Sequence, residues 1–461
     1  MNQPLPSEFI QKLSELFGER FSISNAVLEH HSHDESSYPA VMPQGVVFAN
    51  TTEEIAQLVK YCNQYLVPVI PVAAGTSLEG HVLPIHGGIA LNMNNMNQVL
   101  GVYPEDLIAV VQPAVRRKQL NTELKDTGFF FPIDPGADAS IGGMTATRAS
   151  GTNAVRYGTM RENVLALTVV TATGEIIRTG TQAKKSSAGY DLTRLYVGSE
   201  GTLGIITEVT LKIYPQPENL AAAICSFPSI MDAVSSVIQV IQLGVPVSRV
   251  ELVDELAIRA INQYSKLNLK EQPTLFFEFG GSSQSIKEQT ESVQEIVKSF
   301  SGEDFEWATH PEDRARLWHA RHNAYFACLQ LQAGSRIMNT DVCVPISKLA
   351  QCIEETQHDL QNSWLKAPIL GHVGDGNYHV LLVIDPNNPK DLEEAERLNS
   401  LIVHRALKLG GTCTGEHGVG MHKIDFLVDE YGQDAIDVMR SIKQALDPNN
   451  ILNPGKIVKM A

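Results

Sequence analysis

The chain has 461 residues, of which 43% are hydrophobic, and it carries a formal net charge of −16. This length is too great for one ordinary core, so we expect two or three domains. The acidic excess and the lack of a lysine- or arginine-rich tract argue against nucleic acid as a partner, because phosphate binding needs clustered basic residues.

The N-terminus and the cysteines bear on location. The first residues have neither the apolar core of a signal peptide nor the composition of a transit peptide, and no run of about 18 apolar residues appears. The six cysteines form no C-x-x-C pair, which favours reduced thiols and gives no support for an iron–sulfur cluster. We expect a cytoplasmic protein without a transmembrane segment, and peripheral contact with the inner membrane stays open.

Residues 1–217 are predicted to form an α+β region rich in short strands. A helix with an apolar face spans 7–17, with Ser7 as its cap. A strand, a helix capped by Thr51 or Thr52, and a second strand follow and indicate a β-α-β unit. Further strand-like runs lie at 88–96, 107–115, 166–180 and 203–215.

Pro215 and Pro217 mark a boundary. From 218 to 432 strands and helices alternate, which predicts a ferredoxin-like antiparallel sheet with helices on one face. The pattern includes one long helix over 311–331. A final helix is predicted over 433–446.

Two glycine-rich loops in the first region are typical of a phosphate-binding site. They are PVAAGTSLEGH (71–81) and the segment 134–158. Small residues let the backbone approach a ligand, and consecutive N–H groups can wrap a phosphate. Two such loops predict a dinucleotide-sized ligand, and ordinary turns are the alternative. Neither loop contains the Rossmann or P-loop signature.

These two loops, together with VGSEGTLGIITEVTLKIYP (197–215), closely resemble the FAD-binding domain of the vanillyl-alcohol-oxidase flavoproteins. The resemblance implies a two-part, PCMH-type FAD domain with a core over about 38–217, to which the C-terminal segment 433–461 returns. It implies non-covalent FAD, because Thr76 stands where covalent members often carry histidine. The implied cofactor-binding residues are Pro71, Ala73, Ala74, Gly75, Thr76, Ser77, Gly80, Pro135, Gly136, Ala137, Ser140, Gly142, Gly143, Thr147, Ala149, Ser150, Gly151, Glu200, Gly204, Ile205, Ile206 and Asn453.

A second group of candidate residues lies in GHVGDGNYH (371–379) and GTCTGEHGVG (411–420). A turn between His372 and His379 could bring both imidazoles together, and Glu416 could add a carboxylate. Two histidines and a carboxylate are a common divalent-metal set, and Asp375 could orient a ring. A turn followed by a strand with a structural histidine is the alternative.

The same two strings, and the tail NPGK (453–456), are very like the FAD-dependent D-2-hydroxy-acid dehydrogenases, and nearest to their D-lactate-oxidising members. The resemblance implies that His372, His379 and Glu416 bind zinc or manganese in a substrate (cap) domain over 218–432. It implies that His417 is the catalytic base and that Arg321, with Trp318, binds the substrate carboxylate. A surface ion pair of Arg321 with Glu312 or Asp313 is the alternative.

Asn339 bears on the substrate. Members that oxidise 2-hydroxyglutarate commonly carry lysine at this position, so an uncharged Asn339 favours a monocarboxylate such as D-lactate. TDVCVPIS (340–347) is also especially like the D-lactate enzymes. The resemblance implies a quinone or cytochrome as electron acceptor and leaves a homodimer open. D-2-hydroxyglutarate dehydrogenase, a glycolate oxidase flavoprotein subunit, a zinc hydrolase and a non-catalytic docking subunit are the alternatives.

Other conspicuous side chains are predicted to be structural. We expect His81 and His86 on solvent-facing turns beside the first glycine loop, although a role beside the flavin stays open for them. His404 and His422 are expected to be structural or exposed, and Met93 and Met96 to pack at a strand end.

Overall fold

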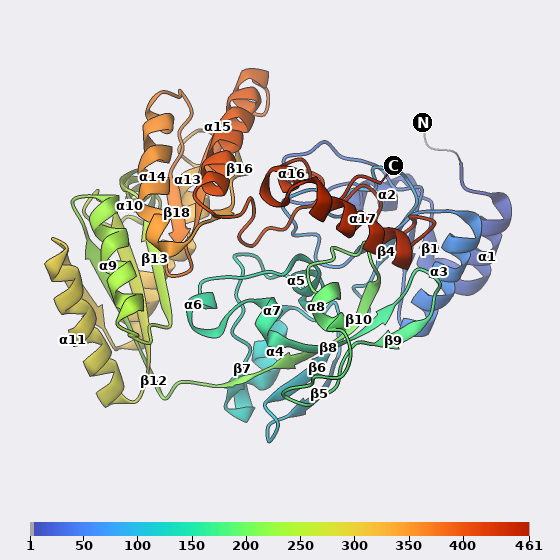
Figure 1. Ribbon diagram of the computed structural model, residues 1–461, viewed down its shortest axis with the longest axis horizontal. Helices are drawn as coiled ribbons and strands as arrows, with labels where there is room; N and C mark the ends of the chain where they lie inside the picture. Colours follow the sequence, from blue (N-terminus) through green and yellow to red (C-terminus); the bar gives the residue numbers. More distant parts are fainter. Residues whose placement is uncertain (1–3, 461) are drawn as a thin grey trace. The chain divides into compact units, whose positions relative to one another are not determined.

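The computed structural model describes residues 4–460, and the chain folds into two compact units (Figure 1). The first comprises the chain up to Ser150, residues 158–216 and the chain from Glu416 onward. The second comprises 151–157 and 217–415. This division differs from the predicted bounds at 151–157 and 416–432. The segment with Glu416 and His417 therefore begins where the second unit ends.

A four-stranded sheet of order β1-β2-β4-β3 opens the first unit. Its strands are β1 (Phe21–Ser22), β2 (Gly45–Phe48), β3 (Val69–Val72) and β4 (Ile89–Asn92). β2 and β3 both pair in parallel with β4, and α3 (Thr52–Tyr65) connects them. The Thr51 side chain accepts a hydrogen bond from the Glu54 amide, which confirms the predicted cap.

The N-terminal helix α1 (Ser7–Phe17) and its apolar face are confirmed. Its N-cap position is Pro6, however, so the predicted cap at Ser7 is wrong. Phe9 and Leu13 pack with α3 and the first sheet, and Met93 and Met96 are buried in the same core, as expected.

The first unit also holds a five-stranded antiparallel sheet of order β5-β6-β10-β8-β9. Its core packs against α5 (Ile141–Thr147), which carries part of the second glycine loop. The strands are β5 (Val99–Tyr103), β6 (Ile108–Val111), β8 (Val164–Val170), β9 (Ile176–Arg178) and β10 (Ile205–Lys212), and β7 (Phe129–Phe130) pairs with β11 (Tyr214–Pro215). The remaining helices are α2 (Asn25–His30), α4 (Arg117–Leu124), α7 (Met160–Asn163), α8 (Leu192–Tyr196), α16 (Phe426–Tyr431) and α17 (Gln433–Leu446).

The C-terminal segment joins the first sheet as an added edge. The Val69 amide donates to Ile451 O at 2.8 Å, and the Asn453 amide donates to Val69 O at 3.0 Å. These bonds form a parallel bridge between Val69 and Leu452. They place Asn453 beside the first glycine loop, since that loop follows β3 directly.

The second unit is built on an eight-stranded sheet of order β15-β12-β14-β13-β18-β19-β16, with β17 paired to β19. Every pairing in it is antiparallel, which confirms the predicted sheet. The strands are β12 (Asn219–Ser226), β13 (Arg249–Val253), β14 (Thr274–Gly281), β15 (Glu303–Ala308), β16 (Arg336–Asn339), β17 (Val342–Cys343), β18 (Ile369–His372) and β19 (Asn377–Ile384).

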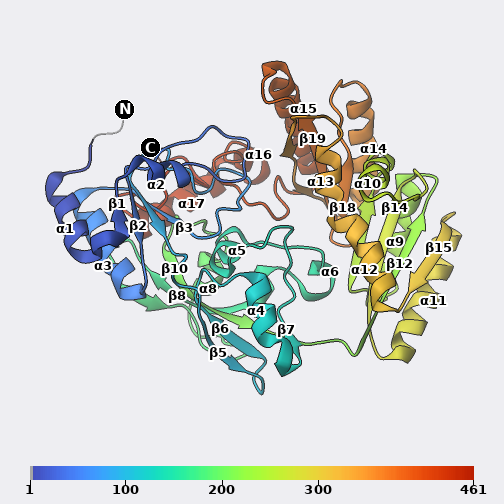
Figure 2. The same cartoon turned by 180° about the vertical axis from the view of Figure 1, so that it is seen from behind.

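Helices cover both faces of this sheet (Figures 1 and 2), so the expectation of helices on one face is wrong. α10 (Glu255–Ser265), α12 (Pro311–His322) and α13 (Ala324–Leu329) share a core with Phe276 of β14. On the opposite face of β12, Cys225 lies against Gly302, in the turn that follows α11 (Ser283–Ser299). The other helices are α6 (Ala154–Tyr157), α9 (Ile230–Gln242), α14 (Ile346–Gln361) and α15 (Pro389–Lys408).

The predicted helix over 311–331 is divided at Asn323 into α12 and α13. No disulfide joins cysteines within residues 4–460, in line with reduced thiols. Across that described range, no helix has both the length and the apolar character that membrane crossing requires.

Candidate active site

The first glycine loop presents a run of open backbone amides. Within residues 4–460, the N–H groups of Ala73, Ala74, Gly75 and Thr76 donate no hydrogen bond. Gly75 has φ +69°, and a Cβ added there would meet nothing within 4 Å. Consecutive amides around a left-handed glycine form a concave anion site. The loop therefore fits the predicted role of binding a pyrophosphate.

The second glycine loop has the same character up to α5. In the described part of the chain, the N–H groups of 136–139 also donate no hydrogen bond. Ser140 then caps α5 by accepting from the Gly143 amide. Gly142 packs so closely that an added Cβ would lie 2.5 Å from Pro113 Cβ, which explains the glycine at this position.

Glu200 connects the predicted cofactor segments to one another. It has a left-handed backbone, with φ 53°, and its amide donates to Ala146 O at 2.9 Å. Its carbonyl accepts from Asn453 Nδ2 at 2.8 Å, and the same amide nitrogen donates to His81 O at 3.0 Å. Ile205 instead points into the hydrophobic core and is fully buried. The loops and Asn453 thus lie together, whereas Ile205 could contribute only backbone atoms.

The loop that carries Glu416 and His417 is held by the side chain of Glu200. Its two carboxylate oxygens accept from the amides of Val419 and Gly420, at 2.7 and 2.8 Å. Gly418 has φ +87°, and an added Cβ would lie 2.7 Å from His81 Nε2. Gly418 is therefore needed for close packing against His81, at the end of the first glycine loop.

A second buried carboxylate, Glu79, lies beside the same loop. Its oxygens are 3.4 Å from His417 Nδ1, 2.7 Å from His422 Nδ1 and 3.3 Å from Lys423 Nζ. Burial alone would raise the pKa of the Glu79 carboxyl, but Lys423, His417 and His422 hold it well below its usual range. Glu79 is therefore a buried anion that faces three nitrogen donors.

Three further histidines, His81, His86 and His422, also had expected positions. His81 is 4% exposed, so its expected solvent-facing turn is wrong. Burial would lower the pKa of His81, but Glu200, at 3.4 Å from its Nε2, raises it. His422 is held by Glu79, which agrees with a structural role, and His86 is exposed as expected.

In the second unit, a β-hairpin brings the two predicted metal-binding histidines together. His372 ends β18 and His379 lies in β19, and these strands pair directly. Their ring centroids are 5.4 Å apart at an interplanar angle of 80°. Gly376 in the turn has φ +82°, and a Cβ there would lie 2.1 Å from Val344 O. Only glycine fits this turn.

Glu251 of β13 holds His372 and Arg321 at once. Its Oε1 lies 2.7 Å from His372 Nδ1, and its Oε2 accepts from Arg321 Nη2 at 2.6 Å. Burial would raise the pKa of the Glu251 carboxyl, but His372 and Arg321 hold it below its usual range. Asp375, the residue expected to orient a ring, is exposed, and the contact to His372 Nδ1 comes from Glu251.

His379 is oriented by the chain around Asp341. Its Nδ1 lies 3.0 Å from Thr340 O and 3.8 Å from Asp341 Oδ1. A carbonyl only accepts, so Nδ1 carries the proton and Nε2 has the lone pair. Asp341 Oδ1 accepts from Asn377 Nδ2 at 2.9 Å, and Oδ2 accepts from Thr414 Oγ1 at 2.7 Å.

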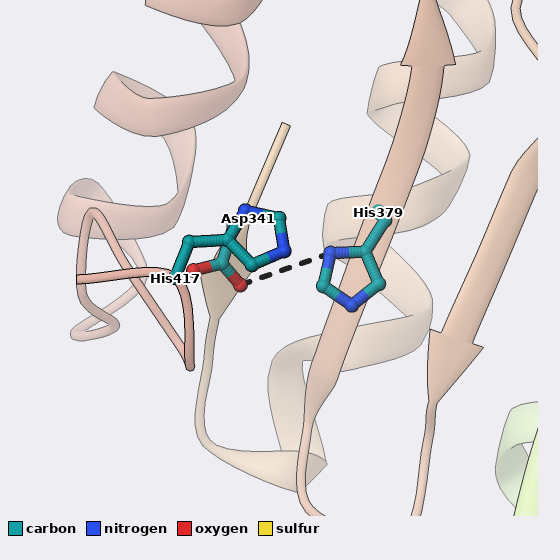
Figure 3. A group of neighbouring side chains, drawn as sticks. All are labelled: Asp341, His379 and His417. Carbon is teal, nitrogen blue, oxygen red and sulfur yellow. Dashed lines mark ion pairs between the residues drawn. The ribbon is translucent and has the colours of Figure 1, made fainter. Parts of the chain in front are cut away.

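Two overlapping groups of side chains have the composition of a metal site. One is His372, His379 and Glu416, the predicted set; the other is Asp341, His379 and His417. In each group the ligand-type atoms lie within 4.8 Å of one another. Figure 3 shows the second group, with Asp341 and His379 joined by their ion pair and His417 beside them. Both Asp341 oxygens accept hydrogen bonds, from Asn377 and Thr414, and the first group is the set that the resemblance implies.

Arg321 does not form the predicted alternative ion pair with Glu312 or Asp313. It lies on the last turn of α12 and bonds to the buried Glu251, whereas Asp313 is 4.0 Å from Arg316. Trp318, one helical turn earlier, is 6% exposed. Within residues 4–460, Arg321 Nε and Trp318 Nε1 are buried donors without a hydrogen-bond partner. Such donors suit an anionic ligand.

Sequence patterns did not predict Glu79 and Glu251, the two carboxylates behind these side chains. Glu79 does lie within the first glycine loop, in the string LEGH (78–81), and an acidic residue among small ones was the available signal. Glu251 lies in VELVD, an apolar strand of the buried sheet, and an acidic residue there was the only hint. The spacing of residues in the sequence did not reveal which side chains Glu79 and Glu251 contact.

The first unit is an α+β unit with phosphate-type loops. The second is an antiparallel-sheet unit with an arginine, a buried carboxylate and paired histidines. This combination is typical of a flavin-dependent oxidoreductase. The family of FAD-linked oxidases, defined by their C-terminal domain, matches residues 216–457, and an FAD-binding domain matches 43–180. The chain therefore belongs to the FAD-linked oxidase family.

Curated relatives match nearly the whole chain. A probable mitochondrial D-lactate dehydrogenase of Danio rerio is 49% identical over 96% of this chain and 90% of its own length. A mitochondrial D-lactate dehydrogenase [cytochrome] of Arabidopsis thaliana is 44% identical over 98% of this chain and 80% of its length. The glycolate oxidase subunit GlcD of Bacillus subtilis is 34% identical over 95% of this chain and 94% of its own length.

Solved structures support the fold alone. p-Cresol methylhydroxylase, with substrate bound, matches with a TM-score of 0.82 at 19% identity, over 98% of this chain and 96% of that one. This likeness confirms the predicted FAD-binding fold. The FAD-binding domain match also confirms FAD as the expected cofactor.

Proposed function

We propose that this chain oxidises D-lactate to pyruvate and passes the electrons through FAD to a cytochrome or a quinone. Two relatives that match almost the whole chain are named as D-lactate dehydrogenases. The observation that carries the proposal is the buried Glu251, which fixes the proposed substrate-binding Arg321 and the proposed metal-binding His372 from one carboxylate. A 2-hydroxy acid needs both groups next to each other.

FAD would be held by the backbone of the first unit. The open amides of 73–76 and 136–139 suit its pyrophosphate, and Glu200 and Asn453 tie these loops to the C-terminal segment. Thr76 offers no ring nitrogen for a flavin linkage, which supports non-covalent binding. When bound, FAD accepts a hydride from the substrate Cα.

A zinc or manganese ion would be held by His372, His379 and Glu416. Glu251 and Thr340 engage Nδ1 of the two rings, so each imidazole would use Nε2 as its ligand atom. When bound, a divalent ion lowers the pKa of a hydroxyl group that it contacts. Because Glu251 and Thr340 already orient the two imidazole rings, these rings would need little rearrangement to bind the metal ion.

The substrate carboxylate would be bound by Arg321. Glu251 occupies Nη2 and fixes the guanidinium plane. The buried Nε of Arg321 and the indole N–H of Trp318 have no partner within the described residues 4–460, so both can donate to an anion. A planar guanidinium gives charge-assisted, oriented bonds that lysine does not reproduce.

His417 would remove the hydroxyl proton as the substrate is oxidised. Its Nδ1 faces Glu79 at 3.4 Å, so Nε2 is the atom suited to accept the proton. An imidazole is moderately basic near neutral pH, and general base catalysis contributes about 10²–10⁴-fold to a rate. The residue would therefore act in the chemical step rather than in substrate binding.

Asn339 supports a monocarboxylate as substrate. Its Oδ1 is buried without a hydrogen-bond partner among the described residues, and its side chain carries no charge for a second substrate carboxylate. Burying such a carboxylate unpaired is strongly unfavourable. D-Lactate is thus favoured over D-2-hydroxyglutarate, whereas glycolate, the smaller homologue, is the second candidate because of the likeness to the glycolate oxidase subunit.

Anaerobic mixing of the flavin-loaded protein with single 2-hydroxy acids tests the proposal. The flavin absorbance should bleach with D-lactate, more slowly with glycolate, and not with L-lactate or D-2-hydroxyglutarate. Treatment with a chelator should slow bleaching, and zinc or manganese should restore it. Bleaching by none of these acids would overturn the function, and a flavin-free protein with metal-dependent hydrolysis would favour the zinc hydrolase alternative.

A further inference from the structure

The loop that carries the proposed base is fastened at two different points by two buried glutamates. Glu200 takes only backbone amides of this loop, those of Val419 and Gly420. Glu79 instead faces side chains, namely the ring nitrogens of His417 and His422. One carboxylate therefore sets the path of the loop, and the other faces the ring that the reaction would use.

We propose that Glu79 is a positioning residue for His417 and selects the ring tautomer that can act as a base. This inference rests on the proposed function, in which His417 takes the hydroxyl proton. A carboxylate only accepts hydrogen bonds, so it favours the tautomer with a proton on Nδ1. That tautomer leaves the lone pair on Nε2, where a substrate proton can be received.

The backbone is built so that Glu79 can reach the histidine loop. Gly420 has φ +53°, and an added Cβ would lie 2.0 Å from Glu79 O. The Met421 amide donates to that same oxygen at 3.0 Å. Only a glycine at 420 permits this approach. The main chain at Glu79 thus supports the segment that begins with His417, in addition to the contact made by its side chain.

The division of the two Glu79 oxygens argues against a role limited to neutralising Lys423. Oε1 lies 3.3 Å from Lys423 Nζ and 3.4 Å from His417 Nδ1, and Oε2 lies 2.7 Å from His422 Nδ1. An ion pair with Lys423 alone would need one oxygen and no imidazole. Both histidines present Nδ1 to this carboxylate, which is the arrangement expected of a residue that orients rings.

The first test replaces Glu79 and measures anaerobic flavin reduction by D-lactate per bound flavin. Glu79→Gln offers an amide N–H₂ that can favour the wrong tautomer, so the reduction rate should fall about 10²–10⁴-fold. The kinetic isotope effect with D-lactate deuterated at Cα should become fully expressed. FAD content should stay near one per chain. His422→Gln, which leaves Oε1 and His417 in place, is the matched control and should stay within a few-fold of the unchanged protein.

Loss of the Glu79 charge also removes the carboxylate that pairs with the buried Lys423 ammonium group, and this loss can destabilise the protein. Two further variants meet that difficulty. Glu79→Asp keeps the charge but withdraws it by one methylene, and the pair Glu79→Gln with Lys423→Met removes both charges. Both should load FAD and still reduce it slowly. A rate per flavin near that of the unchanged protein in either variant would overturn the proposal.

A measurement on the unchanged protein gives an answer without any variant. The ¹⁵N chemical shifts of the His417 ring should show the Nδ1–H tautomer, and the Nε2–H tautomer would overturn the proposal. This readout is independent of turnover. Failure of the unchanged protein to bleach with any D-2-hydroxy acid would instead overturn the proposed function, so the two failures are distinguishable.

Discussion

The two units build their candidate sites from different materials. In the first, the backbone makes the site: open amides follow β3 and precede α5, and glycines allow close approach. In the second, side chains hold side chains, as Glu251 does for Arg321 and His372. A backbone site depends on conformation and tolerates side-chain changes, whereas a network of buried side chains fails when one member is lost. Substitutions in the glycine loops should therefore have smaller effects than substitutions in the buried side-chain networks.

The largest effects are expected from the proposed metal ligands His372, His379 and Glu416. Glu416→Gln or His372→Asn should abolish stoichiometric zinc or manganese binding and slow flavin reduction by more than about 100-fold, because outer-shell changes alone typically cost about 10–100-fold. Metal content per chain and reduction rate are the measurements.

Asp341→Asn is the matched variant for the competing ligand group. If His372, His379 and Glu416 hold the ion, the Asp341→Asn variant should retain most of the metal, because Asp341 is outside that set. Loss of metal in Asp341→Asn, together with retention in Glu416→Gln, would assign the ion to Asp341, His379 and His417 instead.

A smaller loss is expected when the shared carboxylate is neutralised. Glu251→Gln leaves Arg321 without its buried counter-charge and His372 without a carboxylate on Nδ1. Metal affinity and the rate of reduction by D-lactate should fall about 10–100-fold. Metal titration and stopped-flow reduction measure the two effects separately.

Glu278→Gln supplies the control for that experiment. Glu278 is also mostly buried and pairs with Arg249 at 3.4 Å, which is a different arginine from the one that Glu251 holds. If both glutamine variants lose activity equally, general destabilisation of the sheet would explain the result better than the bridging role.

In the first unit, a change of backbone preference should have a modest effect. Gly75→Ala places a side chain at φ +69° without any clash. The left-handed region costs an alanine about 1–2 kcal/mol, so FAD affinity should fall about 5–30-fold. Equilibrium titration of the apoprotein with FAD measures this. Gly189→Ala has a similar φ of +76° in open space and should leave FAD affinity unchanged; an equal loss there would contradict the assignment.

The smallest effect on turnover is expected from Asp254, which caps α10 in the second unit. Burial raises the pKa of its carboxyl to about 7. Between the unfolded value near 4 and about 7, the folded protein binds more protons than the unfolded chain, so the free energy of unfolding should fall as pH rises across this window. Urea unfolding across that range should show a slope that Asp254→Asn reduces; identical slopes would contradict it.

Glycine-based features were predictable from the sequence because they depend on local conformation. The loops at 71–81 and 134–158 contain their own signal, and the hairpin that joins His372 to His379 follows from its glycine turn. β-Alternation and helical periodicity likewise located most strands and helices. The break at Asn323 inside the predicted helix 311–331 was not predicted, since the apolar pattern continues through it.

Contacts between distant segments could not be predicted from one sequence. Glu251 meets His372 only because β13 pairs with β18 in the folded sheet. The alternation of apolar residues along each strand does not reveal which strands become neighbours. Glu79 meets His417 and His422 because the C-terminal segment returns to the first sheet. His81 was misjudged for the same reason, since the loop at 418–420 covers it.

The sharpest test of D-lactate oxidation is anaerobic reduction of the bound flavin by D-lactate, compared with L-lactate in the same metal-loaded protein. We expect complete bleaching with the D-enantiomer, no bleaching with the L-enantiomer, and pyruvate formed in an amount equal to the flavin reduced. Equal bleaching by both enantiomers, or none by either, would contradict it.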